Sequence, residues 1–186
     1  METRTGQLPS DKRLFIGIPL DRVCQQHLDE SLAILRENRD VRWVSSGNRH
    51  LTLAFLGNTT IEVLHQLQKH FANAYPDNKP FIYPLTQMVR FPDAQGHIVA
   101  AVNAPSEALM ALHQQTLELV SSCGLPVEGR PYRPHVTLGR IQHPRKFLQE
   151  IDMKLSLELA VGKVCLYESV PTEQGRLYKV LSECAF

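Results

Sequence analysis

Two short motifs with the same layout stand far apart in the chain: His-Leu-Thr-Leu begins at His50, and His-Val-Thr-Leu begins at His135. Side chains alternate between the two faces of a β-strand. Each motif would therefore present its histidine and threonine on one face and bury its two aliphatic residues on the other. With 8 His and 9 Thr in 186 residues, His-x-Thr is expected about 0.4 times by chance. Two occurrences indicate that both histidines have a function.

Paired imidazoles and hydroxyls match the needs of phosphodiester chemistry. An ordinary imidazole pKa of about 6.5 lets one histidine accept a proton near pH 7 while the other donates one. In-line displacement at phosphorus requires the attacking and leaving oxygens to be served from opposite sides, and one histidine from each motif would do this. Thr52 and Thr137 would donate hydrogen bonds to the non-bridging phosphate oxygens. The motifs thus predict acid-base catalysis by His50 and His135.

A basic stretch surrounds the second motif. Between Gly129 and Lys146 there is no acidic residue, so this stretch would attract phosphate in an otherwise neutral chain. Its basic residues are Arg130, Arg133, Arg140, Arg145 and Lys146. Arg145 and Lys146 fit a solvated basic face equally well. Arg140 lies five residues after His135 and would point to the opposite face of a regular strand, so its participation requires the strand to end or twist near Gly139.

The elements that must position these residues recur in the same order. A strand and a helix precede each His-bearing strand, and the spacing is similar: 33 residues from Gly17 to His50 and 34 from Ala101 to His135. This indicates an internal duplication and two similar lobes that face each other. The first half is predicted to contain strands at 13–20, 42–44 and 50–56, with helices at 21–38, capped by Asp21, and from Thr59 or Thr60 to about 74.

The second half is predicted to contain strands at 81–91, 98–102 and 135 onward, and a helix that starts at Ser106 and ends near Gly124. Further strands are expected at 155–161, 164–169 and 178–182. We therefore predict an α+β fold that is bilobal with pseudo-twofold symmetry, with mainly antiparallel sheets facing a central cleft and helices outside. Residues 1–186 would form one two-lobed domain, with residues 1–12 as a flexible tail.

Composition excludes several other classes of protein. Hydrophobic residues make up 43% and charged residues 21%, and the net charge is +1, which are ordinary globular values. No secretory or membrane-spanning segment is evident, so we expect a soluble, cytoplasmic protein with no membrane partner and no obligate protein partner.

The spread of four cysteines argues against disulfides or a zinc site. Neither His motif has a carboxylate within four residues, and P-loop and Gly-x-Ser-x-Gly patterns are missing, so no metal or cofactor is expected.

The chain resembles the two-histidine phosphoesterase superfamily, in particular its bacterial RNA 2′,3′-cyclic phosphodiesterase branch, also described as tRNA 2′-5′ ligase-like. The resemblance covers RLFIGIP at 13–19, RWVSSGNRHLTLAFLG at 42–57, FP at 91–92, RPYRPHVTLGR at 130–140 and LYESVPTEQGRLYKVL at 166–181. Many relatives carry a tryptophan in the strand at 98–102, where this chain has Ala100 and Ala101, so the source of base stacking is open.

The resemblance implies roles for several residues. His50 would donate a proton to the leaving 3′-oxygen, and His135 would activate water, so that an RNA 2′,3′-cyclic phosphate becomes a 2′-phosphate. The substrate would be RNA, including tRNA fragments, and 2′-5′ ligation would be the reverse chemistry. Arg140 matches a family position for phosphate binding, and Phe15 would line the cleft. Arg133, from the basic stretch, is also expected to contact substrate. Two alternatives remain: a non-catalytic RNA-end or nucleotide-binding module, or the same chemistry on a small cyclic nucleotide, an ADP-ribose cyclic phosphate or 2′-5′ oligoadenylate.

Overall fold

The computed structural model describes residues 11–147, 149–173 and 175–186. Within these ranges the chain forms nine strands, three α-helices and a short 3-10 helix, mostly as an antiparallel sheet, which confirms the α+β prediction. Most of the predicted tail lies outside the described residues. Its last residue, Lys12, already belongs to the first strand, which begins one residue earlier than predicted.

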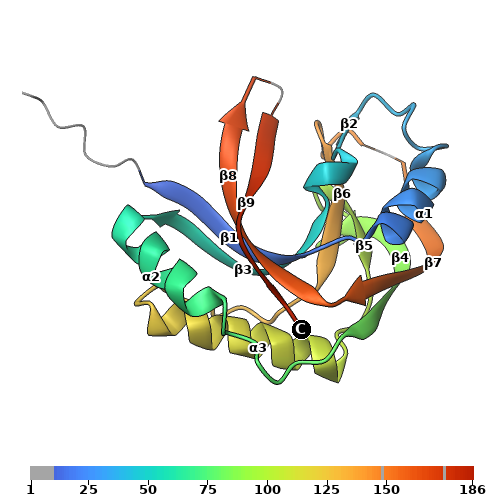
Figure 1. The fold of residues 1–186 in the computed structure, drawn as a ribbon. Helices are drawn as coiled ribbons and strands as arrows, with labels where there is room; N and C mark the ends of the chain where they lie inside the picture. The colour runs from blue at the N-terminus through green and yellow to red at the C-terminus, as the bar shows by residue number, and fades with distance from the viewer. Residues whose placement is uncertain (1–10, 148, 174) are drawn as a thin grey trace, which may run out of the picture.

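The elements follow the predicted order closely (Figure 1). The strands are β1 (Lys12–Pro19), β2 (Val41–Trp43), β3 (His50–Thr59), β4 (Phe81–Phe91), β5 (Ile98–Val102), β6 (His135–Ile141), β7 (Asp152–Val161), β8 (Lys163–Thr172) and β9 (Gly175–Ala185). The helices are α1 (Arg22–Leu32), α2 (Ile61–Phe71) and α3 (Glu107–Ser122), and the 3-10 helix is Ser46–Asn48.

One continuous sheet carries both halves of the duplication. Its strand order is β7-β4-β5-β6-β3-β1-β8-β9, and β2 pairs with β6. Four strands lie on each side of the β3–β6 junction, where a single residue pair, Leu51 opposite Val136, joins the halves. The pseudo-twofold axis therefore passes between the two His-x-Thr motifs. The lobes are two halves of one sheet and not two separate sheets.

Both histidine strands, β3 and β6, contain the same irregularity. In β3 an extra residue is inserted between Thr52, which pairs with Gly17, and Ala54, which pairs with Ile16. In β6 an extra residue is inserted between Thr137, which pairs with Ala100, and Gly139, which pairs with Val99. A β-bulge of this kind shifts the side chains that directly follow it to the other face. The register makes Ala100 the counterpart of Gly17, one residue earlier than the Ala101 chosen from spacing alone.

Helix α1 begins as predicted but ends early. The Asp21 carboxylate accepts a hydrogen bond from the Cys24 N–H, which caps the first turn. The helix ends at Leu32 instead of Asn38, because Leu28 and Leu32 are buried whereas Ile34 is 84% exposed. Without an apolar face to bury, the chain continues in tighter turns such as Leu35 N–H to the Leu32 carbonyl.

The other two helices begin at predicted caps. Thr60, one of the two candidates, accepts a hydrogen bond from the Val63 N–H at the start of α2, and Ser106 accepts one from the Leu109 N–H at the start of α3. Helices α2 and α3 lie side by side, α3 contacts β3 and α2 contacts β9 (Figure 1). Helix α1 contacts β7 on the other half. None of the helices in the described ranges is long and apolar enough to cross a membrane.

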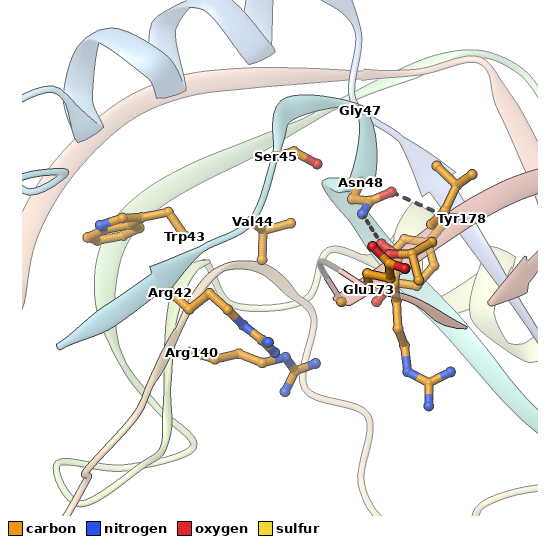
Figure 2. A pocket seen from close by; sticks show the side chains of 13 residues that line it. Arg42, Trp43, Val44, Ser45, Gly47, Asn48, Arg140, Glu173 and Tyr178 are labelled. Carbon is orange, nitrogen blue, oxygen red and sulfur yellow. Dashed lines mark hydrogen bonds between the residues drawn. The ribbon is translucent and has the colours of Figure 1, made fainter. Parts of the chain in front are cut away.

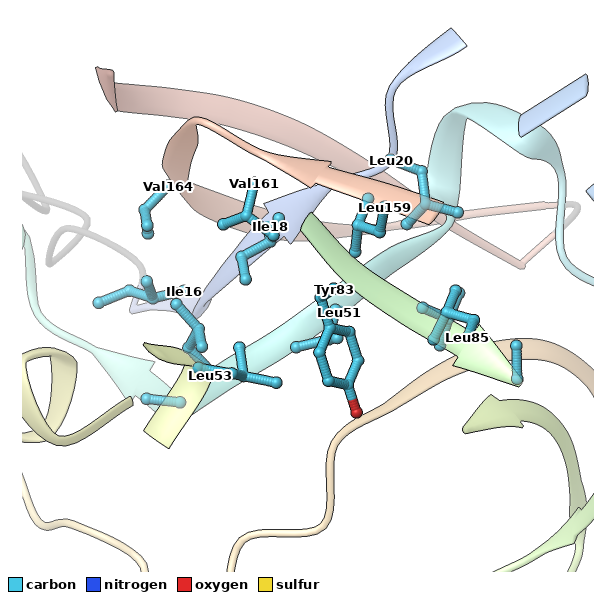
Figure 3. Close-up of a cluster of buried hydrophobic side chains, with 14 of the residues drawn as sticks. Ile16, Ile18, Leu20, Leu51, Leu53, Tyr83, Leu85, Leu159, Val161 and Val164 are labelled. Carbon is cyan, nitrogen blue, oxygen red and sulfur yellow. The ribbon is translucent and has the colours of Figure 1, made fainter. Parts of the chain in front are cut away.

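The principal core forms where the two halves of the sheet pack on each other. Leu51 and Leu53 of β3 meet side chains from β1, β4 and β7, including Tyr83 and Leu159 (Figure 3). These aliphatic residues of the first motif are 0% and 2% exposed. Their burial fixes the opposite face of β3 as the one that carries His50 and Thr52.

Candidate active site

The sheet register brings the two motifs together on one face. Leu51 and Val136 pair across β3 and β6, and extending this antiparallel register places His50 opposite Thr137, and Thr52 opposite His135. Directly opposed side chains share a face, with Cβ atoms about 5 Å apart, and diagonal neighbours lie within about 8 Å. The extended register thus predicts that the two imidazoles form such a diagonal pair. The positive charge of His135 lowers the pKa of His50, as expected for neighbouring rings.

His50 is held by its own turn and by aromatic rings. Its Nδ1 lies 2.8 Å from the Asn48 carbonyl oxygen, and because a carbonyl can only accept, Nδ1 carries the hydrogen and Nε2 remains for chemistry. The rings of Phe15 and Tyr178 lie 4.5 and 5.1 Å from the imidazole. Burial lowers the pKa of His50 to about 4, the Asn48 hydrogen bond opposes this shift, and the charges of His135 and Arg140 add to it.

His135 has a matching environment in the other half. Its Nδ1 lies 2.8 Å from the Arg133 carbonyl oxygen, which fixes the same tautomer. The Phe91 ring stacks on the imidazole at 4.3 Å. Burial lowers the pKa of His135, the hydrogen bond to Arg133 opposes this, and the charges of Arg133 and Arg140 lower it further. Both histidines are therefore neutral at pH 7 in the free protein.

The residue two positions before each histidine anchors it to a neighbouring segment. Asn48 donates from its side-chain amide to the Arg176 carbonyl at 2.6 Å and accepts from the Tyr178 N–H at 3.2 Å, both in β9. Arg133 donates to the Pro92 carbonyl at 2.7 Å, with its guanidinium 4.7 Å from the centre of the Phe91 ring. Each imidazole is thus oriented by a carbonyl whose own residue is tied to another strand or turn.

The bulge in β6 places Arg140 on the histidine face. The extra residue between Thr137 and Gly139 reverses the alternation, so Arg140 follows His135 and Thr137 instead of opposing them. The exposed Arg140 side chain lines a cavity together with His135 and Thr137, and its charge lowers the pKa of both histidines. Arg140 was expected to take part only if the strand ended or twisted near Gly139, and the bulge provides this change of face.

A cavity of about 640 Å³ opens beside His135. Thr52 and Thr137 line it, along with Arg133 and the aromatic residues Phe55 and Tyr132. The Tyr132 hydroxyl donates to the Thr52 carbonyl at 2.9 Å, and the His113 ring stacks on Tyr132 at 3.9 Å. Neither Tyr132 nor His113 is among the site residues predicted from the sequence. Both help to shape this wall of the site.

The remaining predicted residues divide into those at the site and those away from it. Phe15 is 4% exposed, stacks on Tyr167 at 4.8 Å and lies tilted against the His50 ring at 4.5 Å. Phe15 therefore packs against His50 as structural support and offers little surface to a substrate. Arg130 lines the cavity but is paired with Glu128. Arg145 and Lys146 line neither of the two main cavities in the described part of the chain.

Metal ligands are not grouped in the described residues. Among residues 11–147, 149–173 and 175–186, no cluster of three or more His, Cys, Asp or Glu side chains is arranged to hold a metal ion. The four cysteines, Cys24, Cys123, Cys165 and Cys184, are free and buried. Burial raises the pKa of Cys24 to about 11, so this thiol is not activated.

A sheet with pseudo-twofold symmetry and two facing His-x-Thr motifs defines the class of two-histidine phosphoesterases. The family model of the 2′-5′ RNA ligase superfamily matches residues 25–172. The chain belongs to this superfamily. It is 27% identical over 180 residues to an RNA 2′,3′-cyclic phosphodiesterase of Thermotoga maritima, covering 94% of this chain and 95% of the relative. It is 30% identical over 150 residues to the Aquifex aeolicus protein of the same name, covering 76% and 80%.

Solved structures share the fold at low sequence identity. Apo LigT of E. coli superposes with a TM-score of 0.78 at 24% identity, covering 95% of this chain and 98% of LigT. A crystal structure titled phosphoesterase superposes with a TM-score of 0.80 at 23% identity, covering 95% and 98%. These likenesses support the predicted α+β fold.

Proposed function

We propose that this protein hydrolyses RNA 2′,3′-cyclic phosphate ends to 2′-phosphomonoesters by acid-base catalysis between His50 and His135. The observation that carries the proposal is the pair of imidazoles on one face, each with Nδ1 held by a carbonyl and Nε2 left for the substrate. Membership in the superfamily and the names of its relatives support the same substrate class.

The residues divide the reaction as follows. His135 accepts a proton from water through Nε2, and the hydroxide oxygen bonds to phosphorus. The bond from phosphorus to the 3′-oxygen breaks, and His50, protonated at Nε2, gives its proton to that oxygen. Thr52 and Thr137 donate hydrogen bonds to the non-bridging oxygens, and the Arg140 guanidinium balances their negative charge. Attack by a ribose 5′-hydroxyl in place of water would use the same proton transfers and give a 2′-5′ linkage.

His50 must gain a proton before it can act as the acid. Its pKa of about 4 leaves it neutral in the free protein at pH 7. The bound cyclic phosphate supplies the missing negative charge, because an anion next to an imidazole favours the protonated form. Substrate binding and acid formation are therefore coupled in this proposal.

Phe55 is a candidate for stacking on the terminal base. It occupies the position in β3 that Arg140 occupies in β6, five residues after the histidine and beyond the same bulge. Its side chain is 61% exposed and lines the cavity beside His135. Stacking on such a ring tolerates any base. Phe55 would take the place of the family tryptophan that Ala100 and Ala101 replace.

The cellular substrate we propose is RNA with cyclic phosphate ends, such as tRNA fragments, in the cytoplasm. Four free cysteines support a reducing compartment, where thiols stay unpaired. The proposal as a whole is tested by incubating the protein with an oligonucleotide ending in a 2′,3′-cyclic phosphate and excess chelator. We expect a 2′-phosphate product, and replacement of either histidine by alanine should lower the rate by about 10²-fold or more. A 3′-phosphate product, or normal turnover in either variant, would refute the assignment.

A further inference from the structure

A second and larger cavity, of about 920 Å³, lies on the His50 side of the site. It is lined by β2, by the loop before β3 and by the β8–β9 hairpin (Figure 2). Asn48 and Tyr178, which hold and contact His50, are among its walls. Arg140 lines this cavity as well as the one beside His135. The two cavities therefore adjoin each other at Arg140.

Three exposed arginines line the larger cavity: Arg42, Arg140 and Arg176. Arg42 and Arg140 are directly opposite each other in the β2–β6 pair, and their side chains run close together in Figure 2. Like charges in opposed positions destabilise a sheet. In the part of the chain that the structure describes, no ion pair joins any of these three guanidinium groups to a carboxylate. Glu173 also lines the cavity, on the hairpin side.

The turn of the β8–β9 hairpin lies within reach of the Arg42 side chain. A Cβ atom at Gly175 would lie 4.0 Å from Arg42 Nη1, so this guanidinium extends from β2 to the hairpin turn. Arg176 donates to the Ser169 hydroxyl at 3.2 Å, which leaves most of its donors free. A space bordered by Arg42 and Arg176, and continuous with Arg140, suits an anion with several acceptor oxygens.

The two cavities differ in the ligand chemistry they offer. The cavity beside His135 is lined by Phe55, Leu117, Val127 and Tyr132, which suits a base or another flat apolar group. The arginine-lined cavity suits phosphate instead. An RNA chain that enters a site for its terminal nucleotide carries its next phosphate on the 5′ side of that nucleotide.

We propose that the arginine-lined cavity binds the phosphodiester that joins the 3′-terminal nucleotide to its 5′ neighbour. Arg42 is the principal contact and Arg176 the secondary one, while Arg140 serves the reacting phosphate. The preferred substrate is then an oligonucleotide and not a mononucleoside 2′,3′-cyclic phosphate. This inference rests on the proposed function and specifies its substrate class.

The test compares three substrates: a mononucleoside 2′,3′-cyclic phosphate, a dinucleotide with the same cyclic end, and that dinucleotide with a neutral methylphosphonate linkage. We expect kcat/KM of the charged dinucleotide to exceed that of the methylphosphonate by about 10-fold or more, as for the loss of a charge-assisted phosphate contact. Arg42→Ala should bring this ratio close to one and lower the rate on the charged dinucleotide far more than the rate on the mononucleotide. Arg42→Lys, which keeps the charge, should restore part of the ratio.

Arg22→Ala is the matched control, because Arg22 is an exposed arginine of α1 that lines neither cavity. It should behave as the wild type on all three substrates. The log–log salt dependence of binding should weaken by about 0.7 in Arg42→Ala but not in Arg22→Ala, since one fewer phosphate of a single strand is neutralised. Equal rates for the charged and neutral dinucleotides, or an equal loss on mononucleotide and dinucleotide in Arg42→Ala, would overturn the inference.

Binding separates this inference from the proposed function. Titration calorimetry with charged and methylphosphonate dinucleotides that end in a 2′-phosphate needs no turnover. If no cyclic phosphate is hydrolysed, the proposed function fails, while the affinity ratio still decides whether the cavity holds the linkage. If the mononucleotide is hydrolysed and the affinity ratio is one, the function stands and the subsite does not.

Discussion

Binding of a phosphate ester is expected to convert His50 from a neutral imidazole to an imidazolium at neutral pH. The free protein holds the pKa of His50 at about 4, chiefly through burial. For His50 to donate a proton at pH 7, its pKa must therefore rise by about 3 units, which corresponds to about 4 kcal/mol.

A single bound charge is sufficient for this shift. Two unit charges at about 4 Å interact with about 4 kcal/mol at an effective dielectric constant of about 20. A monoanionic cyclic phosphate beside the ring would thus bring the pKa of His50 to about 7. By linkage, a protonated His50 should bind the phosphate about 10³-fold more tightly than a neutral one.

Nuclear magnetic resonance titration of the histidine Cε1 protons measures this directly. Spectra are recorded from pH 3.5 to 9 for the free protein and for its complex with a saturating nucleoside 2′-phosphate, and His50→Ala assigns the resonance. We expect a midpoint near 4 in the free protein and near 7 or above in the complex. A midpoint near 6.5 in the free protein, or a ring that stays neutral at pH 6 in the complex, would refute the coupling.

Three further predictions concern the groups that support the site. Asn48→Ala removes the amide that joins the turn before His50 to β9. In steady-state assays kcat should therefore fall by about 10-fold or more, with a smaller change in KM. Asn73→Ala is the surface control. Gly139→Ala would place a Cβ 2.5 Å from Val41 Cγ1, so urea unfolding should show a loss of about 1–3 kcal/mol in the free energy of unfolding. A variant as stable as the wild type would mean that β2 can move aside. His50 has a folded pKa below its unfolded value, so the unfolded chain binds more protons between about pH 6.5 and 4. The free energy of unfolding should therefore fall as pH drops through this window, and His50 should account for about 2 kcal/mol of this loss at pH 5. Urea unfolding of the wild type and of His50→Ala at pH 7 and pH 5 measures this, and the loss of stability should be smaller in the variant.

The sequence was most informative where one face of a strand is buried. Leu51 and Val136 had to face the core, and that requirement alone aligns each histidine with its threonine on the other face. The caps at Asp21 and Ser106 were equally predictable, because capping depends on residues only three positions apart. Local chemistry therefore identified the central residues and the starts of the helices.

The support of the site depended on contacts that the sequence does not reveal. Whether Arg140 reaches the site is decided by one inserted residue in β6, and the same insertion in β3 brings Phe55 to its position. The role of Asn48 in anchoring the turn before His50 becomes evident only when the fold places β9, about 130 residues later in the chain, beside it. The early end of α1 likewise reflects a missing tertiary partner around Ile34 and not a local stop signal.

The central claim is that His50 and His135 act as one unit on one phosphorus atom. It is tested most directly by the hydrolysis rates of His50→Ala, His135→Ala and the double variant on an oligonucleotide with a 2′,3′-cyclic phosphate end. Residues that act together are not additive, so the double variant should be about as slow as the slower single variant. A double variant slower by the product of the two single effects would contradict the claim.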